Sequence, residues 1–203
     1  MSPRPHGRAG RAAAALLAVA LLAAPRLGLA QTPDPTTVFA GRAQTGPDQR
    51  DIRVVITCST TRTASATGAL SIELYVPHHE ELAPAFDFDS LEGPDANAGK
   101  RTDIETRTVA GAASGDFAVS GWVGVDADAP FGLGLTAAVR GEPARLAAVA
   151  RLLRPLTQGA GQLVWHQGNP REGGTPIVAT LTLTQADAAR LRTIVPPCLA
   201  LAK

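Results

Sequence analysis

The 203-residue chain lacks the motifs that most directly assign a protein to a function class. It has no HExxH, HxH or His/Cys array for a catalytic zinc centre, and no glycine-rich loop leading into a helix for phosphate binding. The segment GAASGD, around Ser114, departs by one place from the G-x-S-x-G spacing of a nucleophile elbow. Its eight aromatic residues are too few to fill a core and also line a sugar-binding groove. We therefore predict no catalytic residue and no cofactor, and favour a non-enzymatic protein over an unrecognised hydrolase.

The chain also lacks an apolar run of the roughly 20 residues needed to cross a bilayer. Its one candidate spans residues 12–24, follows three arginines, and is closed by Pro25 ahead of the small-residue ending Gly28-Leu29-Ala30. This arrangement is typical of a Sec-type secretory signal peptide, so residues 1–30 are predicted to be removed by cleavage after Ala30. The mature chain is predicted to be a soluble periplasmic or secreted protein with no membrane insertion.

Neither sign of charge dominates the mature chain. Residues 1–30 hold four of the 19 basic residues and no acidic one, which leaves 15 basic against 18 acidic residues and a net charge of −3. No Lys/Arg cluster provides the electrostatic footprint of a nucleic-acid-binding protein. The predicted partner is an unknown protein or small ligand, not nucleic acid.

Cysteine is scarce, with Cys58 and Cys198 as the only two. In an oxidising compartment, an even pair without C-x-x-C spacing is more often a structural disulfide than a redox or metal site. The bridge would close a loop of about 140 residues and contribute on the order of 4 kcal/mol to the free energy of unfolding. The alternative is a pair of buried free thiols.

Most of the chain shows the alternation of apolar and polar residues that predicts β-strands. It is clear at residues 51–58, 68–76, 131–140 and 175–184, whereas residues 102–111 carry Thr and charge on both sides and resemble an edge strand.

Helical spacing occurs in two places, and Pro196-Pro197 is expected to stop the second helix. The predicted fold class is α+β, mostly antiparallel β in a sandwich-like sheet assembly, with one medium helix near 143–156 and a short C-terminal helix near 185–195.

The predicted domain organisation is simple. Residues 31–50 are rich in Pro, Gly, Thr and charge, which indicates a flexible leader. Residues 51–203 are predicted to form a single disulfide-tied β-rich domain, a length sufficient for one hydrophobic core.

The segment YVPHHEELAPAFDFDSLEGPD, residues 75–95, combines two histidines with several carboxylates. Imidazole and carboxylate are ligands for divalent metals when they converge from several positions. The candidate metal ligands are His78, His79, Glu81, Asp87 and Asp89. The alternative is a solvated acidic loop that Phe86 and Phe88 anchor on the core.

A second candidate site is an apolar shelf on a sheet face. An exposed tryptophan beside glycines in a strand leaves room for a ligand or a partner strand. The residues of this possible binding face are Trp122, Gly132, Gly134, Trp165 and His166. The alternative is that the helix or a second layer covers the tryptophan.

Together these patterns predict an exported, soluble, non-enzymatic cell-envelope protein. It would bind a partner protein or small ligand through a sheet face and the acidic loop at 75–95. The competing hypothesis is a periplasmic divalent-metal-binding protein that uses the cluster at 78–95.

Overall fold

The structure is a computed structural model that describes residues 35–60, 68–93, 102–126, 128–138 and 141–200. The predicted signal peptide, its cleavage site after Ala30 and the first residues of the predicted leader lie outside these ranges. The described residues all belong to one compact unit.

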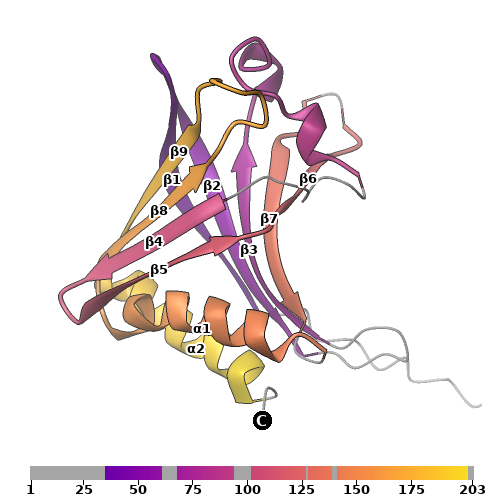
Figure 1. The fold of residues 1–203 in the computed structure, drawn as a ribbon. Helices are drawn as coiled ribbons and strands as arrows, with labels where there is room; N and C mark the ends of the chain where they lie inside the picture. The colour runs from indigo at the N-terminus through magenta and orange to yellow at the C-terminus, as the bar shows by residue number, and fades with distance from the viewer. Residues whose placement is uncertain (1–34, 61–67, 94–101, 127, 139–140, 201–203) are drawn as a thin grey trace, which may run out of the picture. The chain divides into compact units, whose positions relative to one another are not determined.

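Nine antiparallel strands form one curled sheet in the order β5-β4-β8-β9-β1-β2-β3-β7-β6 (Figure 1). The strands are β1 (Thr36–Thr45), β2 (Asp48–Ser59), β3 (Ala69–Val76), β4 (Thr102–Thr108), β5 (Gly111–Phe117), β6 (Ser120–Val123), β7 (Phe131–Ala138), β8 (Gly161–Gln167) and β9 (Ile177–Leu183). The predicted α+β, mostly antiparallel class is confirmed. Its β part is one continuous sheet, not two stacked layers.

Two 16-residue helices complete the fold, α1 (Pro143–Gln158) and α2 (Gln185–Ala200), along with the short 3₁₀ helices η1 (His79–Glu81) and η2 (Asp89–Leu91). Helix α2 contacts the central strands β1, β2, β3 and β9. Helix α1 contacts β4 and β5 at one end of the sheet and β7 near the other, so the curl brings both ends to the same helix (Figure 1). Neither helix has the length and apolar character to span a bilayer, within the part of the chain that is described.

The core lies between the helices and the inner face of the sheet. Because side chains alternate across a strand, every second residue of β2, β3 and β7 points inward. Val54, Leu74 and Leu133 are examples, and each has no exposed surface. Leucines of α1 and α2, including Leu153 and Leu191, join the same cluster. The opposite, outer face of the sheet carries the intervening residues, which include polar side chains such as Arg53 and apolar ones such as Val38.

The prediction of a flexible leader at 31–50 is wrong for its described part. Strand β1 occupies Thr36–Thr45 and lies in the middle of the sheet, paired with β2 on one side and β9 on the other. Most of its inward residues, such as Thr37, Ala43 and Thr45, are small or polar although buried. The strand therefore has almost no hydrophobic periodicity, and backbone pairing with its two neighbours places it in the sheet.

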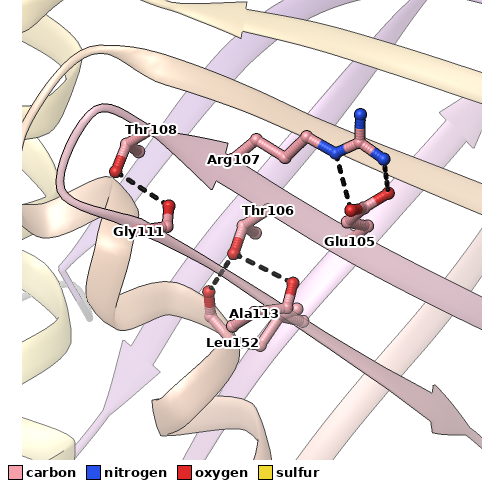
Figure 2. Close-up of polar contacts among 7 residues, drawn as sticks. All are labelled: Glu105, Thr106, Arg107, Thr108, Gly111, Ala113 and Leu152. Atoms are coloured by element: carbon pink, nitrogen blue, oxygen red, sulfur yellow. Dashed lines mark hydrogen bonds and ion pairs between the residues drawn. The ribbon is translucent and has the colours of Figure 1, made fainter.

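The edge strand expected at 102–111 is also in a different place. Strand β4 pairs with both β5 and β8, so β5 is the edge strand. The buried hydroxyls of β4 are satisfied: Thr102 Oγ1 donates to Gln167 Oε1 at 2.5 Å, and Thr106 Oγ1 donates to the Leu152 carbonyl of α1 at 2.7 Å. Figure 2 shows Thr106 reaching α1 while Arg107 pairs with Glu105. A polar strand can be interior when its hydroxyls find partners.

Helix α2 does not stop at the two prolines. It continues through Pro196 and Pro197 to Ala200. Each proline removes a backbone donor and so releases the carbonyl four residues earlier, at Arg192 and Thr193. Both of these residues are exposed, so water can satisfy the released carbonyls. The opposite side of this last turn is held by buried residues, among them Cys198.

The predicted disulfide is confirmed. Cys58 of β2 and Cys198 of α2 are joined, with their Cα atoms 5.7 Å apart and both residues fully buried. The bond fastens the C-terminal helix to the centre of the sheet across 140 residues of sequence.

We expect removal of this bond by Cys58→Ala with Cys198→Ala to lower the free energy of unfolding by about 4 kcal/mol, because a long loop in the unfolded chain is no longer constrained. Urea denaturation of the oxidised protein and of the double variant measures the difference. Equal midpoints for the two would contradict the expectation.

Candidate functional site

One transverse row of side chains crosses five strands on the outer face of the sheet. The strand registers pair Ala40 with Arg53, Arg53 with Tyr75, Tyr75 with Gly132, and Gly132 with Trp122. Directly paired residues point to the same face, so these five residues form one line across β1, β2, β3, β7 and β6. We call this line and its immediate neighbours the outer-face row.

The two glycines of β7 make room for Trp122. A Cβ atom on Gly132 would lie 2.4 Å from Cε2 of the indole, and one on Gly134 would lie 2.7 Å from Cζ3. The indole therefore lies flat over both glycines, and it meets Tyr75 edge-to-face with ring centroids 6.0 Å apart. The glycine shelf is covered by the adjacent edge strand, neither left open nor buried under a second layer. Trp122 itself remains half-buried.

Next to this aromatic pair is an apolar groove of about 430 Å³. Its walls include Ala40, Tyr75, Pro77 and Pro130, and Arg53 contributes the cationic group. The volume falls within the roughly 300–1,000 Å³ usual for small-molecule sites. Geometrically, the outer-face row can accept an apolar ligand or an extended segment of a partner.

The carboxylates near the groove have partners. Glu73 accepts hydrogen bonds from Ser71 Oγ at 3.1 Å and from the Tyr75 hydroxyl at 2.7 Å. Asp51 pairs with Arg42 at 3.4 Å. These two carboxylates thus have protein partners, Glu73 through hydrogen bonds from hydroxyls and Asp51 through an ion pair.

Tyr75 is electrostatically unusual. Partial burial of the phenol, followed by its hydrogen bond to Glu73 and the charge of Glu73, raises the pKa of Tyr75 from 10.0 to about 12, against a smaller opposing effect of Arg53. Tyr75 therefore acts as a fixed hydrogen-bond donor to Glu73 throughout the neutral range.

Trp165 and His166 do not belong to this face of the five strands. Trp165 points inward from β8 and is fully buried, which contradicts its prediction as a binding residue. His166 is exposed on the outer side, but β8 is separated from β7 by β9, β1, β2 and β3. On a short strand, the sequence pattern allows a tryptophan to point either into the core or outward. Only the register of the strand in the sheet decides between the two.

The two histidines of the acidic loop point to different environments. His78 is exposed, with its backbone in the left-handed region at φ 49°. The imidazole of His79 packs against Phe88 and Phe131, each with ring centroids 5.4 Å away. Phe86 and Phe88 are buried, as expected of anchors for this loop.

Two of the remaining predicted metal ligands, Glu81 and Asp87, have protein partners. Glu81 pairs with Arg50 at 3.5 Å, and Asp87 accepts from the Ser90 backbone and hydroxyl. His79, Asp87 and Asp89 do line one small pocket of about 230 Å³. Within the described ranges, no group of three or more His, Cys, Asp or Glu side chains is arranged to hold a metal ion.

Two residues outside the predicted sites fix the loop beside the groove. Arg50 donates to the carbonyls of Pro77 at 2.9 Å and His78 at 2.6 Å. Asn169 donates to the carbonyls of Ala85 at 2.7 Å and Thr175 at 2.9 Å. Arg50 lay in the predicted leader, and neither residue belongs to a hydrophobic pattern that identifies it. The one available signal is the Asn-Pro pair that begins the turn at 169.

Comparison with family models, with curated proteins and with solved structures finds no match for this chain.

The unusual ionisation of Tyr75 can be tested directly, because the chain contains a single tyrosine. We expect phenolate absorbance to titrate with a pKa of about 12, and Glu73→Gln to lower that pKa toward the ordinary value. Because the folded-state pKa is the higher one, the stability linked to Tyr75 is complete below pH 10 and is lost as the pH rises from about 10 to about 12.

The matched control is Glu105→Gln, which removes a carboxylate from β4 and should leave the titration unchanged. A pKa near 10 in the folded wild-type protein would contradict the Tyr75–Glu73 contact.

For the loop, we expect Asn169→Ala to lower the free energy of unfolding by about 0.5–1.5 kcal/mol, because the exposed Ala85 carbonyl and the half-buried Thr175 carbonyl lose their donor. Amides of residues 82–91 should exchange faster with deuterium in the variant. Gln162→Ala, an exposed amide on β8, serves as the control and should change stability by less than about 0.5 kcal/mol. Similar exchange in both variants would mean that Asn169 does not hold the loop.

Proposed function

We propose that this chain is an exported, soluble, non-enzymatic cell-envelope protein that binds a partner protein or a small ligand on the outer-face row. The observation that carries the proposal is the apolar groove beside the Tyr75–Trp122 pair. Tyrosine and tryptophan supply much of the binding energy at protein interfaces, because they are large and lose little entropy on binding. The disulfide supports the exported location, since such bonds persist in oxidising compartments.

The arrangement of the sheet supports binding at this face. Both helices pack on the inner side, and the hydrophobic core uses only the inward residues. Apolar surface on the outer side therefore does not serve the core. Val38 illustrates this, since it is 50% exposed on β1 two residues before Ala40. Apolar residues that gather beside polar ones on an exposed face are a common mark of an interaction site.

The acidic loop takes part as the rim of the groove. Pro77, at the end of β3, is one of the groove walls, and Arg50 ties the backbone at Pro77 and His78 to β2. The carboxylates of Glu80 and Glu81 lie just beyond and are exposed. Because Arg50 holds the loop at Pro77 and His78 and Asn169 holds it at Ala85, the rim is ordered before a partner arrives, which reduces the entropy lost on binding.

Site-specific photocrosslinking tests the proposal. The full-length precursor is expressed in its own host with p-benzoylphenylalanine at Val38, and the exported fraction is irradiated and analysed by intact-mass spectrometry. We expect the processed chain, beginning at Gln31, to carry a discrete adduct, whether the bound molecule is a protein or a small ligand.

The matched position is Val109, which is fully exposed at the tip of the β4–β5 hairpin, away from the outer-face row. A probe there should give no such adduct, and Gly132→Ala should reduce the adduct at Val38, because the new Cβ displaces the Trp122 indole. Identical adducts from Val38 and Val109, or none from Val38, would contradict binding at this face.

A further inference from the structure

The charged side chains around the groove differ in whether they have a hydrogen-bond or ion-pair partner. Each oxygen of the Glu73 carboxylate accepts one hydrogen bond from a hydroxyl, one from Ser71 and the other from Tyr75. Asp51 has the Arg42 guanidinium as its partner. Arg53 lies between these carboxylates on β2, yet it makes no ion pair or side-chain hydrogen bond among the residues that the structure describes.

Arg53 also holds a defined position. Its strand register places it directly between Ala40 and Tyr75, and it lines the groove together with them. Pro77 and Pro130 offer rigid apolar walls, and Asp51, whose carboxylate pairs with Arg42, is the one acidic residue in the lining. The groove thus combines apolar surface with one cationic group that has no ion-pair partner among the residues that the structure describes, and with one carboxylate, Asp51, that already has one.

From this combination we infer that the groove binds an apolar carboxylate, with the carboxylate on the Arg53 guanidinium and the apolar body between Tyr75, Pro77 and Pro130. The inference rests on the proposed function and names its ligand class. A planar guanidinium matches a carboxylate with two parallel hydrogen bonds, and such charge-assisted bonds are stronger than neutral ones.

Other ligand classes fit less well. A cationic ligand would place its charge against Arg53 while the nearby carboxylates are already engaged. A phosphate group carries up to two charges and usually collects several donors, whereas this groove offers one guanidinium. A neutral apolar ligand can enter, but it leaves the cation with water alone and gains nothing from it.

An apolar carboxylate has two possible sources: a small organic acid and the C-terminus of a peptide. The test uses four probes, 4-phenylbutyrate and its amide, and the peptide acetyl-Leu-Pro-Phe with either a free or an amidated C-terminus. Each is titrated into the folded, oxidised protein while the Trp122 indole N–H and the Arg53 side-chain N–H signals are followed by NMR.

We expect at least one free acid to shift both signals with a Kd on the order of 0.1–1 mM. Its amide should bind about tenfold more weakly, because the charge-assisted pair with Arg53 is missing. The better of the two acids then identifies the source of the carboxylate.

Variants separate this inference from the proposed function. Arg53→Gln should reduce acid binding about tenfold and leave amide binding unchanged, whereas Arg192→Gln, on the exposed side of α2, should alter neither. Equal affinity of acid and amide, or acid binding that survives Arg53→Gln, would overturn the carboxylate assignment and leave the binding face intact. If no probe shifts the groove signals, the ligand class is wrong, while the Val38 crosslink still decides whether the face binds anything.

Discussion

The one-sided core of a single curled sheet is the constraint on which the rest of this structure depends. Nine strands turn every second residue inward, and the two helices and the acidic loop cover that face. The hydrophobic gain comes from this one interface, because the described strands form a single sheet with no second sheet packed behind it. The disulfide holds the C-terminal helix against the centre of the same interface. The disulfide between Cys58 and Cys198 lies where α2 packs against β2.

A one-sided core leaves the outer face free for other uses. There, β6 adds Trp122 over the glycines of β7, and Tyr75 donates to Glu73 at 2.7 Å. These contacts hold two aromatic rings rigidly in a partly exposed position beside an apolar groove. Partial burial of the phenol and this hydrogen bond to Glu73 raise the pKa of Tyr75. Packing and ionisation are therefore linked through one pair of side chains.

The sequence pattern predicted secondary structure correctly where the burial of apolar side chains dominates. Strands such as β2 and β3 alternate strongly, and the first helix begins at Pro143 as its spacing indicated. Pattern failed where a partner distant in sequence outweighs local preference. Strand β1 has few apolar residues to bury and is placed by pairing with β2 and β9, while the buried hydroxyls of β4 are placed by Gln167 and Leu152.

By itself the sequence determined the α+β class, the antiparallel strands and the pairing of the two cysteines, because these follow from residue periodicity and from residue number. Tertiary structure alone decided which residues meet. It turned Trp165 inward and Trp122 outward, sent His78 and His79 into different environments, and aligned Ala40, Arg53 and Tyr75 in one row. The reason is that a shift of one residue in strand register reverses every side chain, and register depends on pairing between segments far apart in the chain.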